Sequence, residues 1–183
     1  FHVIPNESIN LKERSVFENG IKSFWSDTPL PNVVMLLGWN YILTDNFIDF
    51  FRKNNCLVLN MHPALPDSFV GANAVQKTFL QLQAGKMTET GSMIHVVTPN
   101  LDRGAVLGVS NVQMNSNYFK TEEELREVIK MNEKPLISSV VNLLINEYEK
   151  DRLDSFLTEM CVPVNGPESK YTPFYRGKVR QVT

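Results

Sequence analysis

Residues 31–66, PNVVMLLGWNYILTDNFIDFFRKNNCLVLNMHPALP, contain the pattern that decides the fold. Val33–Leu37 and Leu57–Met61 are apolar without alternation, which is typical of strands that are buried on both faces of a sheet. The amphipathic segment between them starts at Thr44, a residue type that caps helix N-termini, and ends near Asn54. A strand, a crossover helix and a second strand of these lengths predict a parallel, right-handed βαβ unit.

The rest of the chain continues this alternation of helices and strands. Hydrophobic spacing predicts, in chain order, a strand at 1–5, helices at 7–25 and 74–84, strands at 91–97 and 105–114, and a helix at 121–148. Pro135 should kink or split the last helix, because proline lacks the N–H that the helical ladder needs. Residues 150–173 are polar, with three prolines after Val162, and they predict a linker or a surface tail.

Composition excludes several classes of protein. A chain of 183 residues is long enough for one domain with a substantial core, and its net charge of -2 argues against a nucleic-acid partner. Two cysteines, Cys56 and Cys161, cannot form a disulfide framework, so we expect a reducing, cytoplasmic compartment. The apolar runs are too short to span a bilayer. The chain begins with Phe1 rather than Met, and we expect it to be part of a longer polypeptide.

Two short polar motifs carry the residues best suited to chemistry. Asn60 and His62 stand where the second apolar run of the opening stretch ends, and Asp102 lies in the later sequence LDRG. In an open α/β sheet, ligands bind at the carboxyl ends of the strands. The three histidines are far apart in the sequence, so no metal site is predicted, and no nucleotide-binding glycine motif or nucleophile elbow is present.

An amide, an imidazole and a carboxylate suit direct acyl transfer between two bound substrates. Histidine exchanges protons near neutral pH, an amide N–H donates to an oxygen that gains negative charge, and a carboxylate orients the imidazole. No covalent intermediate is needed when the attacking group is an amine, and positioning supplies much of the rate. Structural roles stay open for all three residues: a turn cap for Asn60, a packing role for His62 and a turn position for Asp102.

Four stretches, GWNYILT, LNMHPALP, GSMIHVVTPNLDRG and VIKMNEKPL, resemble the formyltetrahydrofolate-dependent formyltransferase family. The resemblance extends over residues 1–148 and is greatest to the members that formylate glycinamide ribonucleotide in purine synthesis. It implies an α/β, Rossmann-like fold with a mostly parallel sheet flanked by helices, lacking the N-terminal phosphate-loop unit of the family. The implied reaction takes the formyl group from 10-formyltetrahydrofolate, a cosubstrate, without a metal.

The resemblance also assigns roles to individual residues. Asn60 would hold the formyl oxygen, His62 would assist proton movement from the attacking amine, and Asp102 would pair with His62 and order a water. His95 would support this group, and Lys130 and Glu133 would bind the amine substrate. The residues that would line the folate pocket are Trp39, Asn40, Tyr41, Ile42, Leu43, Pro99, Asn100, Leu101, Arg103 and Gly104.

Other readings within and outside this family remain open. A methionyl-tRNA formyltransferase would need a basic RNA-binding domain, a formyltetrahydrofolate hydrolase would release formate, and a folate-binding module would have no activity. Residues 174–183, FYRGKVRQVT, resemble the first strands of SAICAR synthetase, which would mean fusion to another purine enzyme. We therefore divide the chain into a catalytic core at 1–149, a linker or tail at 150–173, and a tail or following domain at 174–183, with small-molecule substrates, no nucleic acid and no membrane.

Overall fold

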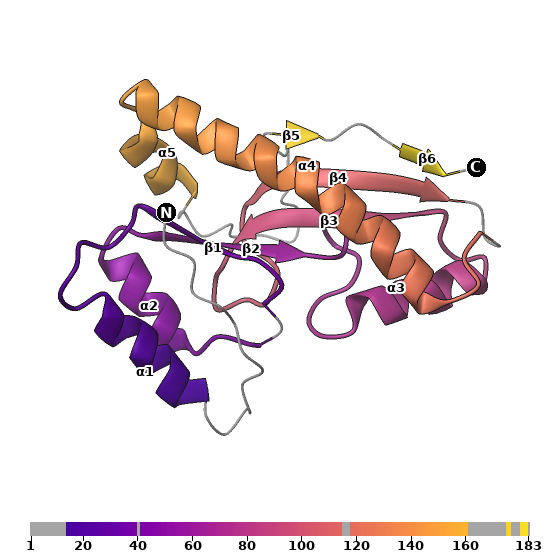
Figure 1. Ribbon diagram of the computed structural model, residues 1–183, viewed down its shortest axis with the longest axis horizontal. Helices are drawn as coiled ribbons and strands as arrows, with labels where there is room; N and C mark the ends of the chain where they lie inside the picture. The colour runs from indigo at the N-terminus through magenta and orange to yellow at the C-terminus, as the bar shows by residue number, and fades with distance from the viewer. Residues whose placement is uncertain (1–13, 40, 115–117, 161–174, 177–179, 183) are drawn as a thin grey trace.

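The structure, a computed structural model, describes residues 14–39, 41–114, 118–160, 175–176 and 180–182 (Figure 1). The strand predicted at 1–5 and the first turns of the helix predicted from residue 7 lie outside these ranges. The elements are α1 (Arg14–Phe24), β1 (Val33–Leu36), α2 (Asp45–Lys53), β2 (Leu57–His62), α3 (Ala74–Gln83), β3 (Glu89–Val96), β4 (Val106–Met114), α4 (Glu122–Glu149), α5 (Leu153–Met160), β5 (Tyr175–Arg176) and β6 (Arg180–Val182).

One sheet runs through the molecule in the order β1-β2-β3-β4-β5, with β6 also paired to β4. β1 and β2 pair in parallel across α2, which confirms the predicted βαβ unit. β3 is antiparallel to both β2 and β4, whereas the β1–β2, β4–β5 and β4–β6 pairs are parallel, so the described sheet is mixed and mostly parallel, as expected. The short loop between β3 and β4 fits their antiparallel pairing, because a parallel pair needs a crossover of about a dozen residues or more.

The two faces of the sheet have different coverings. Leu57, Leu59 and Met61 of β2 face the core beneath α4 and α5, while Val58 faces the cluster around α2. Successive residues of a strand point to opposite faces, so one strand contributes to both layers. α1 lies beside α2 on the second face (Figure 1). None of the helices in the described ranges is both long and apolar enough to cross a membrane.

α2 begins where its sequence predicts. Thr44 is extended at φ -77° and its hydroxyl accepts a hydrogen bond from the N–H of Phe47 at 3.2 Å, as an N-cap does. The helix ends at Asn54, and Asn55 turns the chain through the left-handed region at φ 55°. Asparagine tolerates this conformation better than most residues, which allows a tight return into β2.

Pro135 does not split α4, which runs without interruption from Glu122 to Glu149. The ring removes the hydrogen bond to the carbonyl of Met131, one turn earlier. Both residues are on the exposed side of the helix, so solvent is available as a partner for that carbonyl. The buried stripe on the opposite side, which includes Leu136 and Val140, is unaffected.

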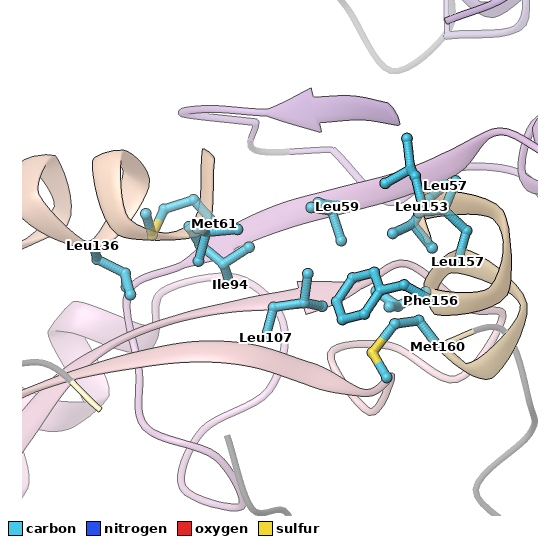
Figure 2. Packing of buried hydrophobic residues seen from close by; sticks show 12 residues of the cluster. Leu57, Leu59, Met61, Ile94, Leu107, Leu136, Leu153, Phe156, Leu157 and Met160 are labelled. Atoms are coloured by element: carbon cyan, nitrogen blue, oxygen red, sulfur yellow. The ribbon is translucent and has the colours of Figure 1, made fainter. Parts of the chain in front are cut away.

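The predicted linker or surface tail at 150–173 is wrong over Leu153–Met160. These residues form α5, and Leu153, Phe156, Leu157 and Met160 are all buried against β2, β3 and α4 (Figure 2). Their spacing of three and four is that of an amphipathic helix, but the segment is too short for periodicity alone to reveal it. The hydrophobic core therefore includes residues up to Met160, beyond the boundary expected at residue 149. Residues 161–173 lie outside the described ranges.

Replacing Leu157 by alanine tests whether α5 belongs to the core. Leu157 is 6% exposed, so the substitution should lower the free energy of unfolding by about 2–5 kcal/mol, measured by urea denaturation. The same change at Leu80, which is 59% exposed on α3, is the control and should cost less than about 1 kcal/mol. Equal effects at the two positions would contradict the core assignment of α5.

Candidate active site

The pleat of two neighbouring strands brings three polar side chains to one face of the sheet. Asn60 and His62 are two residues apart on β2 and therefore point the same way. His95 on β3 is the direct register partner of Asn60. The Asn60 Nδ2 and His95 Nε2 atoms are 3.4 Å apart. These polar side chains lie on the same face of β2 as Val58, which packs in the α2 cluster.

Asp102 reaches this group from the loop between β3 and β4. Its Oδ2 atom is 3.5 Å from His62 Nδ1, and its Oδ1 atom is 3.3 Å from His95 Nε2. Oδ2 also accepts a hydrogen bond of 2.7 Å from the N–H of Gly71. Asp102 has φ 53° and Gly71 has φ 73°, so two left-handed residues meet at this contact. The carboxylate consequently fixes two loops against two imidazoles.

The hydrogen bonds of His62 define which of its nitrogens is basic. Nε2 lies 2.7 Å from the carbonyl oxygen of Phe69, which can only accept, so Nε2 carries a proton. Nδ1, facing Asp102, is left as the site that takes up a proton. Burial lowers the pKa of His62 below its ordinary 6.5, although Asp102 and the Phe69 carbonyl both act to raise it. A neutral imidazole with a free lone pair is therefore the state near neutral pH.

Asp102 stays ionised in spite of its surroundings. Burial acts to raise the pKa of this carboxyl, but the hydrogen bond from His95, the N–H of Gly71 and the two imidazoles together lower the pKa below its ordinary 3.8. Its side chain is only 6% exposed. A buried negative charge next to His62 Nδ1 stabilises the imidazolium that forms when this nitrogen takes a proton.

Asn60 keeps unused hydrogen-bonding capacity. His95 donates from Nδ1 to the carbonyl of Val96 at 2.9 Å, and its Nε2 lies 3.3 Å from Asp102 Oδ1 and 3.4 Å from Asn60 Nδ2. Asn60 Oδ1 is buried and, among the described residues, finds no hydrogen-bond partner. A buried amide in this state is poised for a ligand that both accepts and donates.

These side chains line a cavity of about 370 Å³. Asn60, His62, His95 and Asp102 share its wall with two loops of the expected folate pocket, from which Trp39, Tyr41, Ile42, Leu43, Pro99 and Leu101 line it. Asn40 lies outside the described residues. Asn100, Arg103 and Gly104, also expected in this pocket, do not line the cavity.

Arg103 and Gly104 have other tasks. Arg103 pairs with Asp67 on the exposed side of the loop and so joins the two segments that Asp102 and Gly71 join from within. A Cβ atom at Gly104 would lie 1.8 Å from the carbonyl oxygen of Val96, which no side chain tolerates. Glycine at this position allows the loop to return closely to β3, and thereby places Asp102.

Lys130 and Glu133, expected to bind the amine substrate, do not reach this cavity. Lys130 is exposed and pairs with Glu127 at 2.7 Å. Glu133 lies over β3, where its carboxylate accepts from Ser92 Oγ at 3.3 Å. Burial raises the pKa of Glu133 above its ordinary 4.5, while Ser92 and Lys130 act in the opposite direction. This carboxyl belongs to the contact between α4 and the sheet.

The sequence interpretation missed several residues of the cavity wall, including Leu36, Ile48, Met61, Pro63, Val97 and Thr98, and two further sets. Residues 71–75, between His62 and α3, form one side of the wall, and the Gly-Ala-Asn run before a predicted helix was their only signal. Arg126 is the other, one turn before Lys130 on α4. It pairs with Glu122 and Glu123 and is 40% exposed. Arg126 and Lys130 are four residues apart on the same face of α4, so neither residue type nor helix phase favours Arg126; its position along the helix places it at the cavity.

The described residues contain no group of three or more histidine, cysteine, aspartate or glutamate side chains able to hold a metal ion. An ionised carboxylate, a neutral imidazole and a buried amide can together accept, donate and orient a proton.

The family model described as formyl transferase matches residues 2–141. The chain therefore belongs to the formyl transferase family. A phosphoribosylglycinamide formyltransferase of Schizosaccharomyces pombe is 32% identical over 117 residues, which are 64% of this chain and 56% of that protein. The trifunctional purine biosynthetic protein adenosine-3 of Bos taurus is 32% identical over 144 residues, 77% of this chain but 13% of that protein. The chain spans about half the length of the single-function relatives it matches.

Solved structures show the same fold. The phosphoribosylglycinamide formyltransferase of Streptococcus pneumoniae TIGR4 superimposes with a TM-score of 0.61 at 22% identity, covering 74% of this chain and 71% of that one. The corresponding protein of Anaplasma phagocytophilum gives 0.60 at 23% identity, with coverages of 70% and 58%. The α/β, Rossmann-like formyltransferase fold expected from the sequence is thus confirmed.

The imidazole of His62 should titrate below pH 6.5 in an NMR pH series, because burial disfavours its charged form. Asp102→Asn should lower that midpoint further, since the carboxylate is the strongest influence raising the pKa of His62. Asp154→Asn, at an exposed position of α5, is the matched control and should leave the midpoint unchanged. A His62 midpoint that rises in Asp102→Asn would contradict the ion-pair geometry.

Stability should fall on acidification in two stages. The folded-state pKa values of His62 and Asp102 both lie below their ordinary 6.5 and 3.8, so the unfolded chain binds protons more readily in each case. The contribution of His62 is complete above pH 6.5 and is lost as the pH falls through 6.5 toward the lower folded value. Asp102 contributes a second loss below pH 3.8. Urea unfolding between pH 8 and pH 5 should therefore show a shallower decline in His62→Gln than in the wild type.

Proposed function

We propose that the chain carries the catalytic part of an enzyme that transfers a formyl group from 10-formyltetrahydrofolate to the amine of glycinamide ribonucleotide. The observation that carries this proposal is the Asp102 carboxylate between His62 and His95, beside the unsatisfied amide of Asn60, on the wall of one cavity. Membership of the formyl transferase family and the relatives named for this reaction give it further support.

The cavity is suited to a flat heteroaromatic ring that carries polar edges. Its wall combines apolar and aromatic side chains, including Trp39, Tyr41 and Leu43, with the buried polar atoms Asn60 Oδ1 and Trp39 Nε1, for which the described residues provide no partner. Small-molecule sites typically combine an apolar lining with a few convergent polar groups, in volumes of roughly 300–1,000 Å³. A pterin would satisfy atoms that the protein leaves unpaired.

His62 takes up the proton of the attacking amine, and Asp102 stabilises the charge that results. The neutral imidazole takes a proton from the attacking amine at Nδ1, since Nε2 is held by the carbonyl of Phe69. Asp102, 3.5 Å from Nδ1, stabilises the resulting imidazolium and does not itself need to move. If the amine does not reach Nδ1 directly, a water molecule between the amine and Nδ1 relays the proton. His62 then returns the proton to the departing nitrogen of the folate.

Asn60 holds the reacting atoms. Its free amide N–H donates to the formyl oxygen, which gains negative charge when the amine attacks, and its Oδ1 accepts from an N–H of that amine. His95 keeps the amide in place through the 3.4 Å contact between Asn60 Nδ2 and His95 Nε2. The three groups thereby hold two substrates in line, which is the main source of rate in a reaction without a covalent enzyme intermediate.

We further propose that the chain works in the cytoplasm as part of a longer polypeptide with a small-molecule substrate. The trifunctional purine protein of Bos taurus, of which the matched region is 13%, is a precedent for such a region within a larger enzyme. Residues 174–183 remain our candidate for the start of a following domain. Their described parts, β5 and β6, also pair with β4 of this sheet.

His62→Ala, made in the polypeptide that contains this chain, should lower kcat for formyl transfer by about 10²–10⁴-fold, because the proton acceptor is lost. Asp102→Asn should lower it by a smaller factor, and Asp154→Asn, exposed on α5, should leave it unchanged. The assay follows the formylated glycinamide ribonucleotide and formate separately. Full activity in His62→Ala would reject the assignment of this residue.

The same assay separates the competing functions. Formate release without dependence on the amine would indicate a hydrolase, and transfer to methionyl-tRNA would indicate a different acceptor. Binding of the folate without any turnover would indicate a module that holds the cosubstrate for another enzyme. The two enzymatic alternatives each give a distinct product, and the binding module gives none, so no outcome can be mistaken for formylated glycinamide ribonucleotide.

A further inference from the structure

α1 contacts the loop that closes one side of the cavity at three points. Trp39, Tyr41, Ile42 and Leu43 of this loop line the cavity, and Thr44 ends the loop as the N-cap of α2. From α1, the Arg14, Glu18 and Phe17 side chains reach Ile42, Thr44 and Trp39 respectively. Arg14 and Glu18 are four residues apart and so lie on one face of the helix.

Glu18 is the one fully buried residue of α1, at 2% exposed. Its carboxylate accepts a hydrogen bond of 2.9 Å from the backbone N–H of Thr44 and another from the Thr44 hydroxyl. That hydroxyl oxygen in turn accepts from the N–H of Phe47. The chain of hydrogen bonds therefore runs from α1 through the end of the cavity loop into the first turn of α2.

Arg14 and Phe17 hold the middle and the start of the same loop. The Arg14 guanidinium donates to the carbonyl oxygen of Ile42 at 2.7 Å. The rings of Phe17 and Trp39 lie 5.5 Å apart between centroids, with a tilt of 32°. Ile42 presents its side chain to the cavity and is 57% exposed, so its backbone has little packing of its own to fix it.

The inner face of α1 combines apolar packing with a charge. Ile21 packs against the α2 cluster, but the only buried residue of α1 is the carboxylate Glu18. A buried charge contributes little net stability compared with an apolar side chain of similar size, because its desolvation offsets its hydrogen bonds. The carboxylate instead fixes the orientation of Thr44, because the N–H and the hydroxyl of that residue both donate to it.

We propose that Arg14 and Glu18 are positioning residues, which hold residues 41–44 in the conformation that receives the pterin end of the folate. The inference rests on the proposed function for the identity of the ligand. Neither side chain lines the cavity, and neither touches the reacting atoms. They act through the loop, by removing the cost of ordering it when the ligand binds.

The test compares Arg14→Ala, Arg14→Lys, Glu18→Ala and the exposed control Ser15→Ala from the same helix, all in the full polypeptide. Binding of 10-formyltetrahydrofolate is followed by the fluorescence of Trp39 in a Trp25→Phe background. Arg14→Ala and Glu18→Ala should weaken binding about tenfold, the equivalent of one hydrogen bond to a charged group. Arg14→Lys, which retains a donor for Ile42, should recover part of the affinity, and Ser15→Ala should bind as the wild type does.

Kinetics and hydrogen exchange distinguish a positioned loop from a general loss of stability. KM for the folate should rise about tenfold with kcat at saturation unchanged within about twofold, since the reacting groups are untouched. The Thr44 amide should exchange faster in Glu18→Ala than in Ser15→Ala without ligand. If Glu18→Ala does not fold, the two Arg14 variants still decide the question.

The experiment can reject the proposed function and the positioning role separately. If the wild type does not bind 10-formyltetrahydrofolate, the proposed function is rejected, and the exchange rates alone still report whether α1 orders the loop. If the wild type binds and the Arg14 and Glu18 variants bind equally well, with unchanged Thr44 exchange, the positioning role is overturned.

Discussion

The site depends on a single carboxylate that is shared by two imidazoles and one backbone amide. Asp102 is 3.5 Å from His62 and 3.3 Å from His95, and it accepts from the N–H of Gly71 at 2.7 Å. These contacts keep the carboxyl ionised although burial opposes its charge. They also fasten the loop after β3 to the loop after β2. Asp102 therefore sets both the chemistry and the shape of the cavity. Gly104 allows Asp102 to reach this position, because a residue without a Cβ lets the loop pass close to β3.

The same strand supplies both the core and the site. Odd-numbered residues of β2 are buried under α4 and α5, and its even-numbered residues include Asn60 and His62 on the face toward the cavity. Because the strand is held on its other face by the core, the two polar side chains have little freedom to move. Rigid support of this kind favours a reaction between two bound substrates that has no covalent enzyme intermediate, because its rate depends on how well they are positioned.

Much of this arrangement could be predicted from local patterns. The βαβ unit, the Thr44 cap and the position of Asn60 and His62 at a strand end follow from signals that are confined to a few neighbouring residues. The rest depends on packing between distant segments. α5 is too short to show its period, Pro135 is harmless only because its side of α4 is exposed, and Arg126 faces the cavity because of how α4 sits on the sheet. The resemblance to a family placed Asp102 beside His62, whereas its left-handed backbone gave no signal in the sequence.

The pairing of β5 and β6 with β4 has a consequence for the behaviour of shortened forms of the protein. Both segments run parallel to β4 and engage Gly108–Val109 and Val112–Met114 through the backbone. An uncovered strand edge is a template on which other chains can add strands, and β4 is largely apolar and buried. Trimming the polypeptide before Tyr175 would leave the cavity residues in place while turning this edge into a nucleus for self-association and aggregation.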